Sequence, residues 1–400
     1  MTTILKDRRI LLCVSSGIAL YKTVGLVSSL RKSGAELKIV LSPNARKMVS
    51  EIVFSSVGNC SVYTDMFDIN DGWIPHTDLS NWAELLIVAP ATANSIAKIN
   101  HGIADNLLLA TCLAFQGKKM LVPTMNIRMY ENTTTQENLK SLQGKGWEVL
   151  EPGFGHLACG DIGSGRYPEN DVIVQNIEYL LTEKILENLN VLITAGPTRE
   201  KVDSVRYISN RSSGKMGYSM AKAFRYVGSR VNLVSGPVNI APPVGVNITK
   251  VESTYEMGKA VDKYAKKADI IVMTAAVSDY SPKSPVSNKI RKSKETLVIE
   301  MARTRDIIST IRRKQDSILI GFCAEDSDIE SRAQHKLKNK NLDMVFANDI
   351  SKEGIGFDSE FNELLMIRKD GSKEFLPRLP KEELALKVVN LIADYIKKFK

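Results

Sequence analysis

A chain of 400 residues with 44% hydrophobic and 25% charged residues has an ordinary globular composition, and its length suits two domains. It contains no low-complexity tract and no apolar run long enough to span a bilayer, and its first residues lack the long apolar region of a secretory signal. Five cysteines, an odd number without paired spacing, indicate neither a disulfide framework nor a zinc site. We therefore expect a soluble, cytoplasmic protein with reduced thiols, and neither a membrane-spanning nor a secreted one.

The net charge of +9 belongs to the second half of the chain. Residues 1–189 carry 17 Lys and Arg against 19 Asp and Glu, whereas residues 190–400 carry 37 against 26. The basic groups include the KIRKSK run at 289–294 and the spaced lysines 336, 338 and 340. A solvated surface is the simplest interpretation, and a site for a polyanionic small molecule is the second. Nucleic acid ranks last because no aromatic residues are interleaved with these cations.

Short β-branched runs alternate with amphipathic helical stretches, a pattern typical of parallel sheets with crossover helices. In the first half we expect strands at residues 9–15, 36–42, 85–90 and 119–125. Small and apolar residues at helical spacing predict helices at 18–33, 94–115 and 169–188.

A second cycle begins at NVLITAG, residues 190–196, so we expect one domain over 1–189 and another over 190–400. Later strands are expected at 230–236, 269–275, 317–323 and 343–348. The segment 363–377 carries a KDGS turn between two β runs, which predicts an added antiparallel hairpin, and an amphipathic helix with lysines in its last turn closes the chain. The fold class is therefore α/β, with two fused Rossmann-like three-layer domains.

The first strand is followed by SSGIALYK, residues 15–22. The small residues Ser15, Ser16 and Gly17 let the backbone approach a phosphate, and the helix that follows directs its N-terminal N–H groups at it. The spacing is not the dinucleotide-binding fingerprint, and a tight structural turn would use the same residues.

Further segments give this turn a context: LLIVAPATANSIAKINHGIADNLL, VPTMNIRMY and GHLACGDIGSGRYPE. With them, residues 8–175 resemble the homo-oligomeric flavin-containing cysteine decarboxylases, phosphopantothenoylcysteine decarboxylases among them. The residues on which this resemblance rests are Gly17–Lys22, His76 in IPHTDLS, Pro90–Asn94, Pro123–Met129 and Ala158–Arg166. The resemblance implies a bound flavin mononucleotide (FMN), with cofactor contacts from Ser15, Gly17, Ser42, Asn44, Pro90, Thr92 and Asn94.

The resemblance also implies the reaction, an oxidative decarboxylation of the substrate's cysteine moiety followed by reduction. His76 would act as base or orient the substrate carboxylate. Asn126 would hold that carboxylate, beside Met129, and Cys159, on a Gly-rich segment that could act as a lid, would protonate the enethiol intermediate. Taken singly, each has a plain alternative: His76 as a capping or core histidine, Asn126 as a turn former, Cys159 as a small buried residue.

The second half opens with ITAGPTREKVDSVRYISNRSSGKMGYSMAKAF, residues 193–224. SSGKMG lacks the first glycine of the P-loop spacing, so a Walker ATPase is not indicated. Ser212, Ser213 and Gly214 nevertheless expose donors at a helix N-terminus, suited to a triphosphate or a phosphorylated substrate.

This segment, with TAAVSDY (274–280), KIRK (289–292), GFCAED (321–326) and FANDI (346–350), resembles the bacterial, CTP-using phosphopantothenate–cysteine ligases over residues 190–400. A decarboxylase followed by a ligase is the order of the bacterial bifunctional flavoproteins of coenzyme A synthesis. Pro197 stands where the ligase loop usually has a second glycine, so the loop lacks that N–H donor.

In the ligase reaction that the resemblance implies, the carboxylate of 4′-phosphopantothenate attacks CTP to give an acyl-cytidylate, and the amine of cysteine then displaces CMP. Lys289 would neutralise phosphate charge, Asn210 would bind the acyl-cytidylate, and Ser212 and Gly214 would contact the substrate. Asp279 would contact nucleotide or Mg2+. The expected nucleotide contacts are Met273, Thr274, Ala275, Asp279, Lys289, Thr304, Arg305, Asp306, Ile307, Phe322, Lys336 and Lys340.

The resemblance further implies a homo-oligomer, with trimeric decarboxylase domains, dimeric ligase domains and an assembly as large as a dodecamer, and neither nucleic acid nor membrane as a partner. One alternative is a flavin-binding regulatory protein that keeps the fold without catalysis, which His76, Asn126 and Cys159 argue against. Another is an oxidoreductase with two dinucleotide folds, which is disfavoured because neither half has the glycine fingerprint with its acidic partner.

Overall fold

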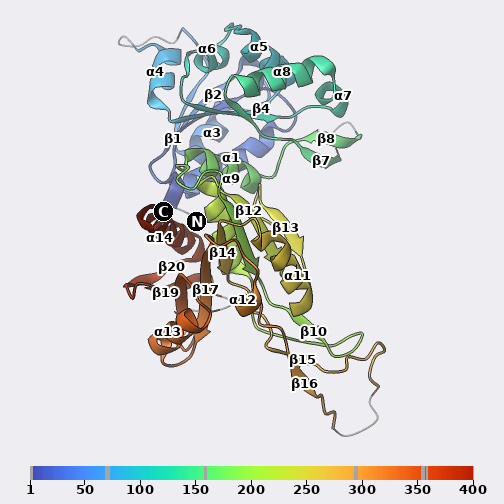
Figure 1. Cartoon of the computed structure of the whole chain (residues 1–400). Helices are drawn as coiled ribbons and strands as arrows, with labels where there is room; N and C mark the ends of the chain where they lie inside the picture. Colours follow the sequence, from blue (N-terminus) through green and yellow to red (C-terminus); the bar gives the residue numbers. More distant parts are fainter. Residues whose placement is uncertain are drawn as a thin grey trace. The chain divides into compact units, whose positions relative to one another are not determined.

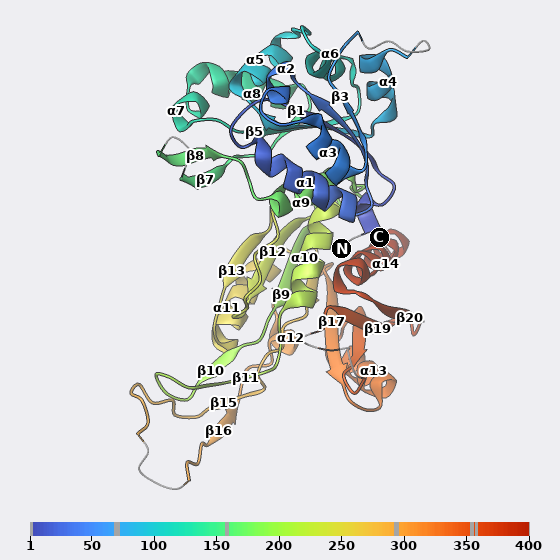
Figure 2. The same ribbon diagram turned by 180° about the vertical axis from the view of Figure 1, so that it is seen from behind.

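The computed structural model describes residues 3–67, 73–156, 160–291, 296–352, 356 and 359–399. The chain forms two compact units, Thr2–Thr182 and Glu183–Lys400. The division falls before Leu186 because this side chain is buried in the core of the second unit, and its N–H donates to the carbonyl of Val227. Each unit is an α/β structure of its own (Figures 1 and 2).

The first unit is built on a six-stranded parallel sheet with the order β3-β2-β1-β4-β5-β6. The four strands expected from the sequence are confirmed, and two three-residue edge strands join them. In chain order the strands are β1 (Arg9–Val14), β2 (Glu36–Leu41), β3 (Ser61–Tyr63), β4 (Leu85–Ala91), β5 (Lys118–Pro123) and β6 (Trp147–Val149).

Helices cover both faces of this sheet, so the unit has three layers (Figure 1). Ile10 and Leu12 of β1 pack in one buried cluster with α1, α3 and α9, and Leu11 packs in the other with α4, α5, α6 and α8. The helical elements are η1 (Thr3–Leu5), α1 (Leu20–Lys32), α2 (Pro43–Arg46), α3 (Glu51–Gly58), α4 (Pro75–Trp82), α5 (Ala93–His101), α6 (Leu107–Ala114), α7 (Ile127–Tyr130), α8 (Thr133–Gly144) and α9 (Asn170–Leu181).

The single helix expected over 94–115 is wrong, because the chain forms α5 and α6 there. Gly102 adopts φ 69° and ends α5, and Asn106 begins α6 by accepting a hydrogen bond from the N–H of Leu109. A two-stranded antiparallel ribbon, β7 (Gly153–His156) with β8 (Ile162–Arg166), was not expected from the sequence.

The second unit has an eight-stranded sheet with the order β13-β12-β9-β14-β17-β18-β19-β20. Its first six members are parallel, and β19 and β20 form the predicted antiparallel hairpin, whose turn has Gly371 at φ 86°. The strands are β9 (Asn190–Ala195), β12 (Arg230–Ser235), β13 (Asn247–Lys250), β14 (Ile270–Met273), β17 (Ile318–Glu325), β18 (Met344–Asp349), β19 (Phe361–Arg368) and β20 (Lys373–Pro380).

Helices again cover both faces: α10 and α14 pack in one buried cluster, and α11, α12 and α13 in the other. Two short ribbons extend from the unit as an arm (Figure 2), formed by β10 with β11 and by β15 with β16. The helices are α10 (Lys215–Tyr226), α11 (Thr254–Ala265), α12 (Ile307–Thr310), α13 (Ile329–Asn339) and α14 (Lys381–Phe399). The ribbon strands are β10 (Arg199–Lys201), β11 (Tyr207–Ser209), β15 (Tyr280–Pro282) and β16 (Met301–Arg303).

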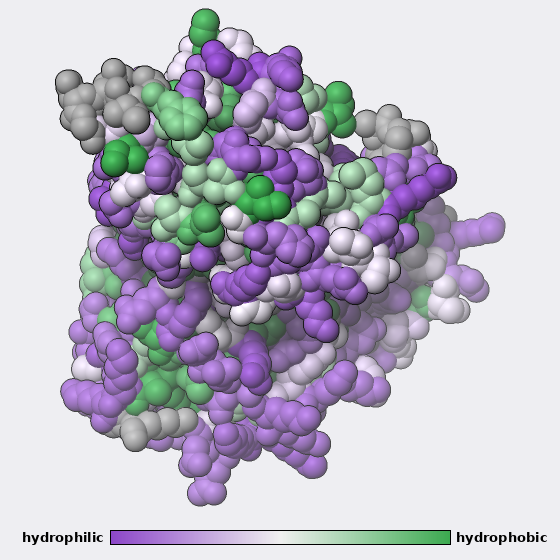
Figure 3. Space-filling view, turned by 90° about the horizontal axis from the view of Figure 1, so that it is seen from above, coloured by the Kyte–Doolittle hydropathy of each residue, from purple (hydrophilic) through white to green (hydrophobic). Residues whose placement is uncertain are grey.

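None of the helices in the described ranges combines the length and the apolar character that a bilayer crossing requires. The face of the molecule in Figure 3 shows small groups of hydrophobic side chains among mainly hydrophilic ones.

Candidate active sites

The first unit has a cradle at the carboxyl ends of β1 and β4. The buried Ser15 hydroxyl donates to the carbonyl of Pro90 at 2.6 Å and accepts from the N–H of Thr92 at 3.1 Å, which locks the two turns together. Gly17 has φ 150°, and a Cβ there would lie 3.8 Å from the Thr92 methyl carbon. The strand order runs outward from β1 in both directions, and such a switch point is where open α/β sheets bind ligands.

The other expected flavin contacts surround this cradle. Ser42 follows β2, donates its N–H to the carbonyl of Val14 and begins α2. Thr92 begins α5 by accepting from the N–H of Ser95. Asn44 and Asn94 are exposed in the first turns of α2 and α5. The seven expected residues thus lie at the carboxyl ends of three adjacent strands.

Asn126 lies in the turn after β5. Its Oδ1 accepts from the N–H of Arg128 at 2.8 Å, and its Nδ2 donates to Asp161 at 3.2 Å. The N–H of Met125 donates to the carbonyl of Gly165 at 3.0 Å, where a Cβ on residue 165 would come within 2.2 Å of the Met125 oxygen. The β7–β8 ribbon is therefore seated on the Asn126 turn, and glycine is required for that approach.

Asp161 was missed at the sequence level, because an acidic residue in a Gly-rich segment carries no pattern that points to an amide partner. Met129, which precedes the end of α7, is 49% exposed and therefore accessible to a substrate. Cys159 lies outside the described residues.

His76 lies in the first turn of α4. Its Nδ1 is buried and has no hydrogen-bond partner in the described part of the chain. Its backbone carbonyl accepts from the hydroxyl of Ser80. No hydrogen bond joins His76 to Ser15 or Asn126 among the described residues. A buried imidazole nitrogen without a partner is suited to a ligand that supplies one.

In the second unit, a turn between β9 and α10 is shaped for close approach. Gly196 and Gly214 have φ 75° and 77°, and a Cβ on Gly214 would lie 2.7 Å from Cγ1 of Val238 and 3.4 Å from the Gly196 nitrogen. Gly214 begins α10 without a side-chain cap, and the Ser212 hydroxyl accepts its N–H at 3.4 Å. The first N–H groups of α10 are therefore directed at the turn, as phosphate binding requires.

The turn compensates for Pro197 through its neighbours. Thr198 donates its N–H to the carbonyl of Ala276, and Ala276 donates its own to the carbonyl of Gly196 at 2.9 Å. The segment after β14 is thereby tied to the turn after β9, although proline supplies no N–H donor.

Asn210 is brought to the same segment. Its Nδ2 donates to the carbonyls of Ala276 at 3.1 Å and Val277 at 3.0 Å, so both amide hydrogens are engaged and Oδ1 remains to accept. Thr274 donates its hydroxyl to the carbonyl of Thr194, while Ala275 donates its N–H to the Thr194 hydroxyl. The expected contacts Met273, Thr274 and Ala275 therefore lie where β14 ends, beside Asn210.

Aromatic and basic residues gather where β17 and β18 run alongside each other. The Phe322 ring stacks on Phe346 with centroids 5.2 Å apart, and Lys336 of α13 donates to the carbonyl of Phe322 at 2.7 Å. Lys340 binds the Asp306 carboxylate and donates to the Ser309 hydroxyl at 3.0 Å. Burial alone would raise the pKa of Asp306, but the bonds from Lys340 and Ser309 lower it.

The segment Thr304–Ile307 is only partly available to a nucleotide. Thr304 is tied to the strand-end loop, because its N–H donates to the carbonyl of Asp279 at 2.9 Å. The Arg305 guanidinium donates twice to Asp262 of α11, at 2.7 and 3.0 Å, and this pairing raises its pKa. The Ile307 side chain is buried in the core.

Asp279 is exposed, and across the described ranges no group of three or more His, Cys, Asp and Glu side chains is arranged to hold a metal ion.

Lys289 is exposed on the arm, next to a clamp that the sequence did not reveal. Asp203 is only 2% exposed and accepts the N–H of Ile290 at 3.2 Å, while Arg206 donates to the Ile290 carbonyl at 3.3 Å. Burial would raise the pKa of Asp203, but the N–H groups of Val205, Arg206 and Ile290 and the Arg206 charge lower it to about 2. The clamp fixes the backbone beside Lys289.

Two α/β units, each with a glycine-containing turn at the carboxyl ends of its parallel strands, thus define a two-domain α/β protein. The Flavoprotein family matches residues 2–182, and the family described as DNA/pantothenate metabolism flavoprotein C-terminal domain matches residues 186–396. The chain is 41% identical to the coenzyme A biosynthesis bifunctional protein CoaBC of Bacillus subtilis, over 97% of each chain, and 41% identical to that of Vibrio cholerae, over 98% of this chain and 99% of the relative. A solved structure of a CoaBC C-terminal domain covers 54% of this chain and 100% of its own, with 40% identity and a TM-score of 0.47.

The chain therefore belongs to the family of bifunctional coenzyme A biosynthesis proteins CoaBC. It is a bifunctional enzyme of coenzyme A biosynthesis, with phosphopantothenoylcysteine synthetase and decarboxylase activities.

Proposed function

We propose that the second unit ligates cysteine to 4′-phosphopantothenate with CTP, and that the first unit, with FMN, decarboxylates the product to 4′-phosphopantetheine. The observation that supports this assignment is a pair of glycine-containing turns at strand ends, one in each unit, in a chain that matches CoaBC relatives over nearly its whole length. The order of reactions follows from chemistry, because the ligase makes the cysteine amide that the decarboxylase consumes.

In the first unit, FMN when bound supplies the two-electron oxidation and its reversal that make loss of CO2 feasible. Ser15, Gly17 and Thr92 would shape the turns that hold its phosphate, because the bonds of Ser15 to Pro90 and Thr92 lock the turns together and Gly17 carries no side chain to obstruct a close approach. His76 acts on the substrate as base or carboxylate contact through its unpaired ring nitrogen. Asn126, oriented by Asp161, holds the substrate carboxylate, and Cys159 donates a proton to the enethiol.

In the second unit, the carboxylate of 4′-phosphopantothenate attacks the α-phosphorus of CTP, and pyrophosphate leaves. Ser212 and Gly214 meet phosphate groups at the start of α10, and Lys289 neutralises the charge that builds on them. The amine of cysteine then attacks the acyl carbon, and CMP leaves. Asn210, whose Nδ2 is held by the strand-end carbonyls of Ala276 and Val277, binds the acyl-cytidylate with Oδ1 as its remaining hydrogen-bonding atom.

Mg2+ is part of this proposal through Asp279. Mg2+ in nucleotide sites is commonly held by one or two carboxylates together with substrate phosphates and water. The exposed Asp279 follows the nucleotide-contacting end of β14 and suits that arrangement. The Phe322 ring, stacked on Phe346, suits the wall of a base pocket.

The proposal includes self-association, with trimeric first units and dimeric second units that together build an assembly as large as a dodecamer. Exposed apolar side chains support it in each unit: Ile52 is 72% exposed on α3, and Val205 is 61% exposed on the arm. We also place the enzyme in the cytoplasm, in keeping with the free thiols of Cys13, Cys60, Cys112 and Cys323. Light scattering coupled to size exclusion tests the assembly.

A coupled assay tests both activities in one reaction mixture. Purified chain is incubated with 4′-phosphopantothenate, cysteine and either CTP or ATP, while pyrophosphate and CO2 are followed separately. We expect a yellow protein that releases FMN on denaturation, and production of both compounds with CTP. Colourless protein that cannot be reconstituted with FMN would count against the first unit's role, and equal rates with ATP would refute CTP preference.

A further inference from the structure

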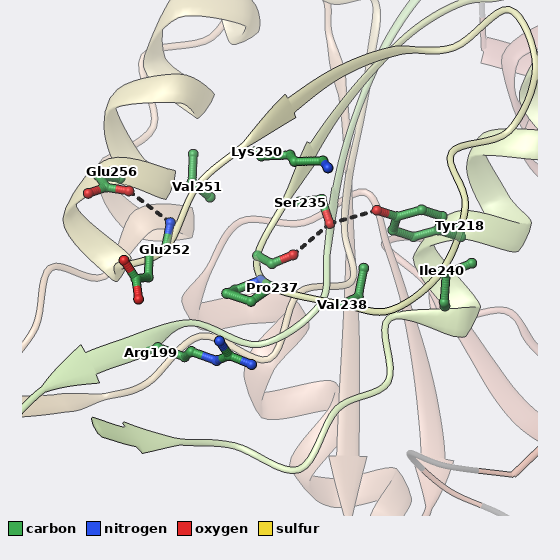
Figure 4. Close-up of a pocket in the computed structure, with 11 residues that line it drawn as sticks. Arg199, Tyr218, Ser235, Pro237, Val238, Ile240, Lys250, Val251, Glu252 and Glu256 are labelled. Carbon is green, nitrogen blue, oxygen red and sulfur yellow. Dashed lines mark hydrogen bonds between the residues drawn. The ribbon is translucent and has the colours of Figure 1, made fainter. Parts of the chain in front are cut away.

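A pocket of about 390 Å³ opens in the second unit, at the carboxyl ends of β12 and β13, and no residue that the sequence predicted for either site lines it. Its volume lies in the range of small-molecule sites, roughly 300–1,000 Å³. Figure 4 shows Arg199 and Lys250 approaching it from opposite sides, with Tyr218 and Ile240 toward one end and Glu252 toward the other.

The floor of this pocket is held by a short hydrogen-bond chain (Figure 4). The Ser235 hydroxyl donates to the carbonyl of Gly236 at 2.8 Å and lies 3.0 Å from the Tyr218 hydroxyl. Because Ser235 has a single hydrogen, Tyr218 is the donor in their contact. Both hydroxyl hydrogens are therefore used within the protein, and neither is available to a ligand.

The acidic residues of the pocket are also engaged. One carboxylate oxygen of Glu256 accepts the N–H of Glu252 at 2.8 Å. The Glu252 carboxylate lies 3.8 Å from the ammonium of Lys201. The backbone carbonyl of Glu252 accepts the N–H of Arg199 at 2.8 Å. Lys201 thus partly neutralises Glu252, whereas Glu256 keeps its charge and has one oxygen occupied by a backbone N–H, so that both glutamates have partners within the wall.

The two cations are not neutralised in this way. The Arg199 guanidinium lies 4.5 Å from the ring centroid of Tyr207, and Lys250 ends β13 in register with Ser235. Within the described ranges, neither cation has a carboxylate partner. Two unpaired cations on opposite sides of one concave site favour an anion, whose oxygens would give them charge-assisted hydrogen bonds.

The remaining wall is aliphatic. Pro237, Val238, Ile240 and Val251 line the space between the polar groups. Val238 also packs on the phosphate-binding turn, since its Cγ1 would lie 2.8 Å from a Cβ on Gly196 and 2.7 Å from one on Gly214. A ligand on Val238 therefore contacts a residue that shapes the ligase turn.

We infer that this pocket binds a small organic anion, with its phosphate or carboxylate group between Arg199 and Lys250 and its aliphatic part on Val238 and Ile240. Phosphate monoesters of branched aliphatic alcohols have this chemistry, and both 4′-phosphopantothenate and 4′-phosphopantetheine belong to that class. The first would come to the pocket as a reactant of the chain, and the second as its end product.

Calorimetric titration of the full chain, without CTP, tests the inference with three probes: each of these two esters and inorganic phosphate. We expect at least one ester to bind, with a Kd raised about tenfold in Lys250→Gln and in Arg199→Gln, the usual effect of losing one charge-assisted hydrogen bond. Lys267→Gln, which removes an exposed lysine at the end of α11 outside the pocket, is the matched control and should leave the Kd unchanged.

Ester binding that is equally tight in wild type and in both pocket variants would overturn the inference, as would the absence of ester binding. If inorganic phosphate binds as tightly as the esters, the aliphatic part of the ligand does not contribute to binding, and that part of the inference is wrong. The ester whose Kd depends on Lys250 shows whether the pocket takes the reactant, 4′-phosphopantothenate, or the end product, 4′-phosphopantetheine. Pyrophosphate release from CTP is measured separately. If the chain releases no pyrophosphate but still binds an ester through Lys250, the proposed ligase reaction is wrong and the inferred site stands.

Discussion

The side-chain nitrogen of Asn210 lies 3.1 Å from the carbonyl oxygen of Ala276, and a second bond to Val277 uses its other hydrogen. This pairing leaves Oδ1 as the end of the amide available to the proposed ligase site. Asn210→Asp places a carboxylate oxygen against two carbonyls, so the side chain must turn away. We expect the variant to form acyl-cytidylate and release pyrophosphate, but to couple cysteine at least a hundredfold more slowly.

Single-turnover assays with labelled CTP measure both steps. Lys289→Gln is the comparison, because loss of its charge should abolish formation of the acyl-cytidylate itself. If the two variants stall at the same step, the assignment of Lys289 to acyl-cytidylate formation and of Asn210 to cysteine coupling is wrong. Asn210→Ser, which keeps a small hydroxyl donor for one carbonyl, should recover part of the coupling rate.

Ser15 joins the turns after β1 and β4 in the first unit. Ser15→Ala removes the acceptor of the Thr92 N–H and the donor to Pro90 at a buried position, with a cost of about 1–3 kcal/mol. We expect about tenfold weaker FMN binding, measured by fluorescence during dialysis, with little change in ligase rate. Ser33→Ala, which also removes a hydroxyl bond to a backbone carbonyl but at the C-terminal end of α1, should retain the flavin.

Asp203 provides a pH-dependent test of the arm. The pKa of Asp203 in the folded chain, about 2, lies below the value of about 3.9 for an unfolded aspartate. The ionised carboxylate therefore contributes its full stabilisation above about pH 3.9, and this stabilisation is lost as the pH falls through 2. At neutral pH, Asp203→Asn therefore loosens the clamp on Ile290. We expect faster amide exchange at residues 286–291 and a lower ligase kcat, with decarboxylase activity unchanged.

The matched control is Glu374→Gln, which removes an exposed carboxylate on β20. The protection factors of the wild-type arm, which correct for the intrinsic pH dependence of amide exchange, should stay constant down to about pH 4. If Asp203→Asn exchanges as slowly as wild type at pH 7, the clamp does not hold the Lys289 segment.

The central strands of both sheets were predictable because apolar β-branched runs ended at small residues, and the motifs at those ends predict Ser15, Thr92 and Thr274 as ligand contacts. What could not be predicted depends on the geometry between distant segments. The contact of Asn126 with Asp161 requires the β7–β8 ribbon, and the pairing of Arg305 with Asp262 requires α11 to lie beside the loop. The break between α5 and α6 depended on one glycine within an otherwise helical pattern.

Burial controls the reactivity of two thiols. It raises the pKa of both Cys60 and Cys323 to about 11, against a usual value of about 8.5, so these two thiols are rarely ionised in the folded chain at pH 8. We expect iodoacetamide to modify both slowly in native protein and rapidly in urea, as followed by peptide mass spectrometry. Rapid labelling of Cys323 in native protein would contradict its burial.

The raised pKa values of these thiols also make the stability of the fold depend on pH. Because the thiols ionise at lower pH in the unfolded chain, the free energy of unfolding should decline as pH rises above about 8.5.

Lys336 holds the strand that carries Phe322, since its ammonium donates to the Phe322 carbonyl at 2.7 Å. Lys336→Met keeps the length of the side chain but removes this bond and a positive charge from the proposed nucleotide site. We expect the KM for CTP to rise about tenfold, with kcat changed less than threefold, because the lost interaction serves binding in the ground state and the transition state alike. Lys338→Met changes the same charge on the same helix at an exposed position and should leave the KM unaltered. Equal increases in KM for the two variants would mean that the general charge of α13, and not the contact with Phe322, attracts the nucleotide.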